Sequence, residues 1–430
     1  MRPAQADVDG RAPTSTPWTL DAMTRTDTTD TRSLATPFLV VLLIAASSVG
    51  QLGSNMYLPS MPGMARSFGV DFATIQLTFS IYLAAMAIGQ LIVGSLSDRY
   101  GRRPMLLIGL SGFVLGSVVC LIADDIGVLF LGRILQAVGG CAGITLGRSI
   151  VRDIYPTHLV ASRLGYISMG MAIPPMIAPT IGGVLDTTYG WRASFFILLL
   201  LGAVVCLAAF WKLPETKPNR GATASMQHLL QSYRSLFGSS VFWAYTLASS
   251  FLFAAFYAFV AGAPYVMIEL MGRSPAEYGI YYAPLPIGYI LGNFAVGRFG
   301  ARLGQNRMIL AGMGITLLSV VAMGAAHAAG VLSPFTLFAP VFFVSLGSGM
   351  ALPGCIAGAV SVKPEAAGAA AGLSGSLQIG VGAVIAPVVG LLIGASVWPL
   401  IVTMAICAVL AFVSFGLIAI QRGSSVLVQS

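Results

Sequence analysis

Long apolar stretches separated by short polar turns constrain this chain most. A helix needs about 20 apolar residues to cross a bilayer, and about twelve such stretches can be marked. They cover residues 36–58, 74–97, 104–123, 127–149, 161–185, 191–212, 241–268, 279–300, 306–328, 333–357, 366–392 and 396–420. Only 9% of the 430 residues are charged and 57% are hydrophobic, which is too little charge to cover a soluble domain of this size. The sequence therefore predicts an all-α integral membrane protein with about 12 transmembrane helices.

Positive charge supports this helix count and predicts an orientation. Lys and Arg in short loops are retained on the cytoplasmic side of a membrane. With the N-terminus inside, 19 of the 23 Lys and Arg residues, Arg148 among them, fall in tails or inner loops. Arg66, Arg192 and Arg273 fall outside, and Arg133 is the only one expected within a helix. The net charge of +8 thus reflects topology and contact with anionic lipid, and nucleic-acid binding is not expected.

A charged turn between two apolar stretches occurs twice. Gly94–Arg103 (GSLSDRYGRR) and Gly297–Asn306 (GRFGARLGQN) share their glycine and arginine spacing at an offset of 203 positions. The pattern Ala-Pro-x-x-Gly at 178–182 recurs at 386–390, an offset of 208. Repeats at nearly one offset predict two six-helix pseudo-symmetric bundles, related by an axis along the membrane normal, as in secondary transporters built from parallel repeats.

The longest polar interior segment divides the two bundles. We expect a disordered cytoplasmic tail without a signal peptide, an N-terminal six-helix bundle, a cytoplasmic linker, a C-terminal six-helix bundle and a cytoplasmic tail. Their ranges are 1–35, 36–212, 213–240, 241–420 and 421–430.

Several motifs resemble those of the major facilitator superfamily. Gly94–Arg103 matches its loop motif, Leu131–Gln136 its fourth-helix motif with an arginine in the membrane, and Gly170–Gly183 the fifth-helix motif associated with antiporters. Met56–Pro62 and Val151–Tyr155 resemble the Bcr/CflA group of drug-resistance exporters. This resemblance implies export of small lipophilic drugs, of the bicyclomycin and chloramphenicol type, across a bacterial inner membrane. It also implies proton antiport, alternating access and a monomer.

One position departs from the group. Its members usually carry an Asp immediately before Met-Tyr-Leu-Pro, whereas Asn55 stands there in this chain. An amide cannot take up and release a proton, so the coupling site expected on the first helix is missing. None of the 15 Asp and Glu residues lies deep in a predicted span. If protons are coupled, Asp98 is the best remaining carrier, and Asp186 and Glu269 are poorer ones.

Intramembrane charge and aromatic side chains suggest where substrate binds. Retaining a charge within the bilayer requires a partner or a water-filled cavity, so we expect Arg133 in the central cavity, facing Asn55 across the outer half of its bundle. Aromatic rings offer a surface to lipophilic compounds. The expected substrate and coupling residues are Asn55, Tyr57, Gln76, Tyr82, Arg133, Gln136 and Tyr257.

The repeated turn and the fifth helix suggest the moving parts. In the loop motif, the resemblance implies a charge latch around Asp98 that breaks when the inner side opens. The expected gating residues are Gly94, Asp98, Arg99, Gly101, Arg102, Arg103, Arg152 and Asp153. Prolines remove backbone donors and glycines allow bending and close approach, which predicts a hinge and seal. The expected hinge residues are Gly170, Pro174, Pro175, Pro179, Gly182 and Gly183.

Two other functions were weighed against drug export. A metabolite exporter for a sugar or an amino acid, or an uncoupled facilitator, would fit Asn55. A membrane enzyme or sensor is disfavoured because Gly-x-Ser-x-Gly, His-Glu-x-x-His and P-loop motifs are absent from the sequence. The five cysteines lie in apolar stretches without a Cys-x-x-Cys pair, so neither a metal nor a cofactor is expected. The expected partners are a small-molecule substrate, protons and membrane lipid.

Overall fold

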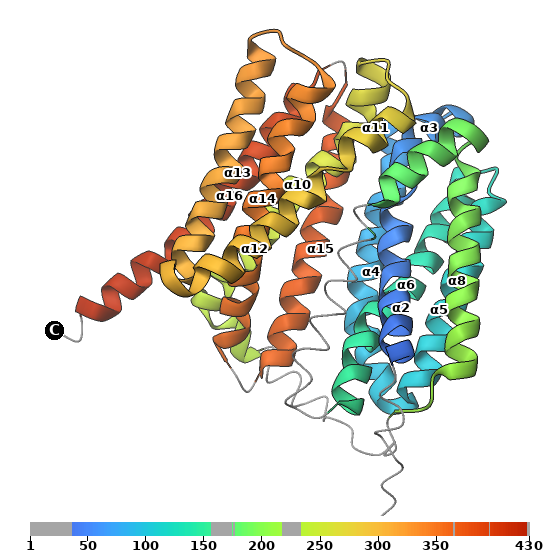
Figure 1. The fold of residues 1–430 in the computed structure, drawn as a ribbon, viewed down its shortest axis with the longest axis horizontal. Coiled ribbons are helices and arrows are strands. Elements are labelled where there is room, and N and C mark those ends of the chain that lie inside the picture. Colours follow the sequence, from blue (N-terminus) through green and yellow to red (C-terminus); the bar gives the residue numbers. More distant parts are fainter. Residues whose placement is uncertain are drawn as a thin grey trace, which may run out of the picture.

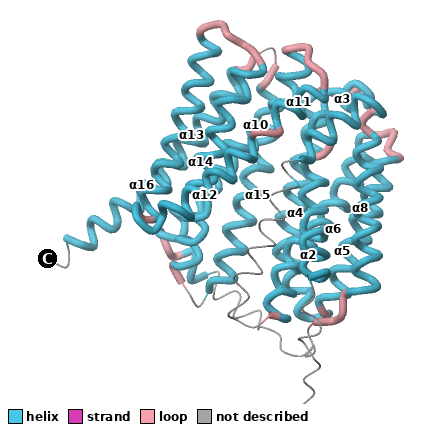
Figure 2. Tube along the Cα trace, viewed as in Figure 1, coloured by secondary structure: helices cyan, strands magenta, loops and turns pink. Residues whose placement is uncertain are grey.

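A computed structural model describes residues 37–155, 174, 177–216, 234–363, 366–394 and 396–427. Every regular element in these residues is helical, and Figure 2 shows helices joined by short loops with no strand among them. Two groups of long helices stand side by side (Figure 1). The predicted all-helical architecture in two bundles is confirmed.

The first group is built around one central helix. Its long helices are α2 (Pro37–Asn55), α4 (Phe72–Tyr100), α5 (Arg102–Leu121), α6 (Ile126–Ile154) and α8 (Arg192–Lys212). The 3-10 turn η2 (Leu58–Ser60) and the short helix α3 (Met61–Phe68) connect α2 to α4, and residues 177–189 are also helical. Because α6 packs against α2, α4 and α5, it is the core of this group.

The second group shares its core between two helices. Its elements are α10 (Ser240–Tyr265), the π-helical turn η3 (Val266–Leu270), α11 (Pro275–Tyr282), α12 (Leu285–Leu303), α13 (Gln305–Ala328), α14 (Pro334–Ser361), α15 (Ala367–Leu392) and α16 (Trp398–Leu427). Helix α14 packs on α12 and α13, whereas α10 packs on α15 and α16. The two groups meet chiefly where α4 packs against α15.

The helices agree closely with the predicted spans. Ten described helices are long and apolar enough to cross a membrane, and they coincide with every predicted span except the fifth and the eighth. The fifth, 161–185, lies largely outside the described residues. The eighth, 279–300, is divided between α11 and α12. Helix α16 continues to Leu427, beyond the predicted end at residue 420.

The two ends of the molecule differ in chemistry. The end of α4, the start of α5 and the last turn of α6 carry Asp98, Arg99, Arg102, Arg103 and Asp153, and we name this the charged end. Figure 1 shows α3 and α11 at the other end, which we name the opposite end. There the Asp71 side chain caps α4 by accepting a hydrogen bond from the backbone N–H of Thr74, and hydrogen bonds from Thr74 lower the pKa of Asp71.

The repeated turn has the same backbone in both groups. Gly101 ends α4 with φ 101° and ψ 156°, and Gly304 ends α12 with φ 83° and ψ 150°. This region of backbone conformation is essentially limited to glycine. The two turns therefore reverse the chain in the same way 203 residues apart, as the repeat in the sequence predicted.

We expect alanine at these two turns to destabilise the protein. Gly304→Ala adds a side chain that meets nothing within 4 Å, so its cost is backbone strain of about 1–3 kcal/mol. Gly101→Ala adds overlap with the Glu215 carboxylate and should cost more. Gly314→Ala is the matched control, because Gly314 lies in helix α13 with nothing within 4 Å, and it should be neutral or stabilising by roughly 0.5–1 kcal/mol.

The measurement is the apparent melting temperature in detergent, followed by fluorescence-detected size exclusion. Equal melting temperatures for Gly304→Ala and Gly314→Ala would contradict the assignment of backbone strain to this turn.

Candidate functional site

A cavity of about 320 Å³ lies between the two helix groups. Its walls combine aromatic rings, hydroxyl groups and one guanidinium. The first group contributes Gln51, Asn55 and Arg148, and the second contributes Leu252, Phe253, Phe256, Tyr257, Tyr282, Pro286, Tyr289, Ser345, Ser348 and Leu352. We name it the central cavity. Arg148 is the only charged side chain among the lining residues that the structure describes.

Two of the expected substrate residues line the central cavity. The Asn55 amide donates to the Gln51 carbonyl at 2.8 Å and to Ser54 Oγ at 2.7 Å, so its donors are satisfied within α2. The Tyr257 ring contacts Phe253 on its own helix and Phe79 on α4, each at a centroid distance of 5.8 Å. Tyr257 therefore joins the cavity wall to the interface between the groups.

Arg133 lies elsewhere, and its expected place in the cavity is wrong. Its side chain is fully buried within the first group and is not among the lining residues. Nη1 donates to the Gly53 carbonyl at 2.8 Å and to Gln136 Oε1 at 2.6 Å. It reaches α2 two residues before Asn55, and no bond between Arg133 and Asn55 occurs in the described structure. The guanidinium is thus held by the bundle and shielded from the substrate space.

Three other expected substrate residues, Tyr57, Tyr82 and Gln136, form a cage around Arg133. Its Cζ lies 4.2 Å from the Tyr57 ring centroid and 4.0 Å from that of Tyr82, a geometry in which ring faces attract a cation. The Tyr82 hydroxyl donates to the Gly50 carbonyl at 2.7 Å, and Gln136 Nε2 donates to Ser117 Oγ at 2.9 Å. Tyr57, Tyr82 and Gln136 are therefore buried packing partners of Arg133, where the sequence analysis expected cavity residues.

Gln76 also lies outside the cavity. It is fully buried where α4 meets α15, and a Cβ added at Gly390 would overlap its amide. Neither amide atom of Gln76 has a hydrogen-bond partner in the described structure. An unpaired amide in an apolar contact costs roughly 1–3 kcal/mol, so this contact carries a built-in penalty that access to water would relieve.

At the opposite end, several contacts join the two groups. Arg66 on α3 forms an ion pair with Glu269 on η3. Thr180 Oγ1 donates to the Gly279 carbonyl on α11 at 2.7 Å. The ring centroids of Phe72 and Tyr265 are 4.7 Å apart. The Arg66–Glu269 pair could not be predicted from the sequence, because the two residues are 203 positions apart and only tertiary packing brings them together.

Three of the described hinge residues, Pro179, Gly182 and Gly183, pack at the opposite end. Pro174 is helical and buried. A Cβ at Gly182 would overlap the Met56 carbonyl, and one at Gly183 would overlap the Pro275 carbonyl, so both glycines lie in close helix contacts. Pro179 lies beside Gly279. Gly170 and Pro175 lie outside the described residues, and the hinge motion itself stays a prediction.

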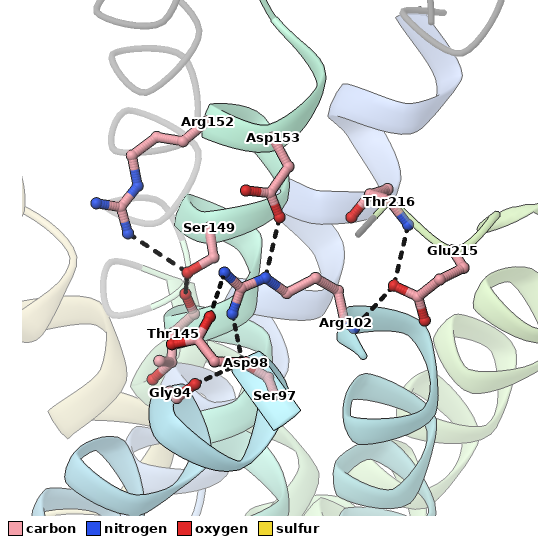
Figure 3. Close-up of polar contacts among 10 residues, drawn as sticks. All are labelled: Gly94, Ser97, Asp98, Arg102, Thr145, Ser149, Arg152, Asp153, Glu215 and Thr216. Atoms are coloured by element: carbon pink, nitrogen blue, oxygen red, sulfur yellow. Dashed lines mark hydrogen bonds and ion pairs between the residues drawn. The ribbon is translucent and has the colours of Figure 1, made fainter. Parts of the chain in front are cut away.

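At the charged end, Arg102 connects three segments of the first group (Figure 3). Its guanidinium pairs with Asp98 at 2.8 Å and with Asp153 at 3.0 Å, while its backbone N–H donates to Glu215 Oε1 at 2.9 Å. The Arg102 side chain is only 10% exposed, against 39% for Asp98. We name Asp98, Arg102, Asp153 and Glu215 the charged network.

The other expected gating residues lie around this network. Gly94 accepts a hydrogen bond from Ser97 Oγ at 2.7 Å, Arg99 stacks on Tyr100, and Arg103 donates to the Phe210 carbonyl at 2.7 Å. Figure 3 shows Arg152 directed toward Ser149 and away from Arg102. Of the expected gating residues Arg152 and Asp153, only Asp153 joins the network.

Sequence reasoning missed Arg148 as a site residue. The topology count assigns it to an inner loop, but the structure places it within α6, six residues before the helix ends at Ile154 and lining the cavity. Position in the predicted span, 127–149, was the available signal. The residue was overlooked because it lies so near the end of that span.

Known proteins of similar sequence and fold match most of the chain. The family model described as Major Facilitator Superfamily matches residues 43–378. Multidrug resistance protein D of Escherichia coli (strain K12) is 32% identical over 341 residues, which cover 79% of this chain and 85% of that one. The chloramphenicol resistance protein of Pseudomonas aeruginosa is 32% identical over 395 residues, which cover 89% and 90%.

A solved structure gives a match to the fold. A bacterial homologue of the human lysosomal transporter Spinster, solved in an inward-facing and unoccupied conformation, superposes with a TM-score of 0.70 at 17% identity. The superposition covers 90% of this chain and 96% of that one, so it extends over both helix groups.

Arg133→Ala is expected to destabilise the first group. Removing a buried, hydrogen-bonded cation leaves the Gly53 carbonyl and the Gln136 amide without their partner and opens a cavity between two tyrosine rings, at a cost of about 3 kcal/mol. Arg133→Lys retains the charge but not the planar fork of the guanidinium. Its melting temperature should lie between those of Arg133→Ala and the natural protein. The melting temperature in detergent measures this, and an unchanged value for Arg133→Ala would contradict the cage.

Arg102→Gln is expected to lower stability by about 2 kcal/mol, because it leaves two carboxylates close together without their shared cation, partly screened by solvent. Arg103→Gln is the control, since it loses one bond to the Phe210 carbonyl, and it should lower stability by less than about 1 kcal/mol. Thermal unfolding of the two variants side by side separates these cases, and equal losses would count against the charged network.

Proposed function

Because this chain belongs to the major facilitator superfamily and resembles its Bcr/CflA drug-efflux group, we propose that it exports small lipophilic drugs by alternating access. It is a multi-pass membrane protein and a transporter. We place it in a bacterial inner membrane as a monomer, with the charged end and both termini in the cytoplasm. The names of its relatives, multidrug resistance protein D and chloramphenicol resistance protein, support a drug as the substrate.

The observation that carries the proposal is a cavity between two groups that are bonded at one end. The cavity is lined mainly by apolar and aromatic side chains, which suits lipophilic compounds. Within the described residues, the side-chain hydrogen bonds and ion pairs that join the groups lie at the opposite end. This arrangement supports a state in which the cavity is closed toward the outside.

In alternating access, the contacts at the opposite end would break as the outer side of the cavity opens. Opening the outer side requires loss of the Arg66–Glu269 pair and separation of residues 177–189 from α11, while water reaches the Gln76 amide. The charged network, whose members all belong to the first group and are paired with one another in this state, would regulate the inner side, as the loop motif of the superfamily implies. The two halves differ here, because the residue that repeats Asp98 in the second half is Ala301. This supports a charge latch in the first half only.

Proton antiport is the proposed coupling, with Asp98 as the first carrier to test. Asn55 supports a second candidate, which is a metabolite exporter or an uncoupled facilitator. The described cavity lining contains no acid, so neither candidate assigns proton exchange to the cavity wall. The poorer carrier Glu269 is engaged in the ion pair with Arg66, and Asp186 is half-buried at the opposite end.

The test measures substrate-driven pH change and substrate flux in proteoliposomes, with chloramphenicol first in a small antibiotic panel. Under proton antiport, the natural protein should move protons with the drug, and Asp98→Asn should reduce proton movement at least about tenfold. Asn55→Asp is a nearly isosteric variant that returns the missing acid to the cavity wall.

The outcomes separate the candidates. Drug flux that is equal with and without a pH gradient, together with proton movement gained only in Asn55→Asp, would support the uncoupled facilitator. Absence of flux for every antibiotic, with sugars or amino acids transported, would replace drug export by metabolite export.

A further inference from the structure

The central cavity carries a positive charge and no described negative one. Arg148 lines it and is exposed to it, and the side chain makes no hydrogen bond or ion pair with any residue that the structure describes. Arg133, by contrast, is fully buried and bonded. Among the described residues, Arg148 is thus the cation that a substrate in the cavity can reach.

The sequence limits how far acids elsewhere can change this balance. Between residues 37 and 427, the undescribed positions are 156–173, 175–176, 217–233, 364–365 and 395. Glu365 is the single Asp or Glu among them. The undescribed part of the predicted fifth span therefore adds no carboxylate to the cavity, and a cationic compound would meet Arg148 without a counter-charge from that helix.

Hydroxyl groups strengthen the case for an anion. Tyr282, Ser345 and Ser348 line the cavity and are each at least 95% buried. None of their hydroxyl oxygens has a hydrogen-bond partner within the described structure. Buried polar groups are almost always paired, so each of these three hydroxyls would gain a partner if a movement of the wall brought it to a ligand oxygen.

The lining also places a cation and several aromatic rings on facing walls of the cavity. Arg148 lies six residues before the end of α6, about 9 Å from the charged end at 1.5 Å per residue. The rings of Phe253, Phe256 and Tyr257 belong to α10 in the facing wall. A ligand with both a charged group and an aromatic body could contact Arg148 and these rings together.

We infer that the central cavity selects amphiphilic organic anions, and that Arg148 binds their carboxylate or sulfonate group. A guanidinium binds such groups through two parallel hydrogen bonds, which are stronger than neutral ones. This inference deepens the proposed export function and rests on it, because it names the charge class of the exported compound.

The test compares three probes of the same size with purified protein in lipid nanodiscs. The probes are 2-naphthylacetate, its methyl ester, and (2-naphthylmethyl)trimethylammonium, with equilibrium dialysis as the measurement and empty nanodiscs as the blank. The natural protein should bind the carboxylate more tightly than the cation. Arg148→Gln should raise the Kd of the carboxylate about tenfold, as expected for loss of one charge-assisted contact, and change that of the ester less than about twofold.

Two variants control for charge and folding. Arg148→Lys retains the charge and should stay within about threefold of the natural protein, because a lysine contacts an oxyanion as a point charge. Arg152→Gln removes a neighbouring cation that is bonded to Ser149 and does not belong to the described lining, and it should leave the Kd of the carboxylate within about twofold. Equal losses for carboxylate and ester in Arg148→Gln, or a preference of the natural protein for the cation, would overturn the inference.

Transport of the same probes separates this inference from the proposed function. If the natural protein in proteoliposomes moves none of the probes and no antibiotic, while the anion preference in binding persists, drug export fails and the anion site stands. If it moves the ester and the carboxylate at rates that Arg148→Gln leaves unchanged, export stands and the anion site fails.

Discussion

Charge is costly in an apolar helix bundle, and the arrangement of this protein follows from where that cost is offset. Arg133 is fully buried, and its charge is offset by a backbone carbonyl, an amide oxygen and two tyrosine rings. Arg102 is offset by two carboxylates at the charged end. Arg148 has no described partner and lies instead where a cavity opens beside it. The three guanidiniums are thus accommodated in three ways: in a buried cage, in an ion-pair network and beside a cavity.

The duplicated sequence produces equivalent contacts at the closed end. The Ala-Pro-x-x-Gly pattern places Thr180 against α11 in one contact and Gly390 against Gln76 of α4 in the other. Both contacts join the two groups through glycines or other small residues that allow close approach. The duplication is incomplete where charge is concerned, since Asp98 has no acidic counterpart at Ala301. In the proposed alternation, the two groups rock about this interface, with the charged network in the first group only.

The surroundings of Asn55 explain how an amide is accommodated at this position. Its amide donors are bonded within α2, so the position is structurally satisfied without a carboxylate. A cavity with an arginine and no described acid is suited to neutral or anionic compounds. The lack of an acid at position 55 and the positive charge of Arg148 therefore both disfavour a cationic ligand in the cavity.

The sequence by itself determined the membrane architecture, because about 20 consecutive apolar residues can be satisfied in a bilayer only as a helix. It also determined the repeated turn, since Gly101 and Gly304 adopt a conformation that other residues avoid. It did not determine which arginine of α6 borders the central cavity. Arg133 and Arg148 are 15 residues apart, about 22 Å along the axis and about 60° around it, so helix geometry leaves them on similar faces. Only the tertiary structure decided between them, because Tyr57 and Tyr82 cover one guanidinium, whereas the gap between the two bundles exposes the other.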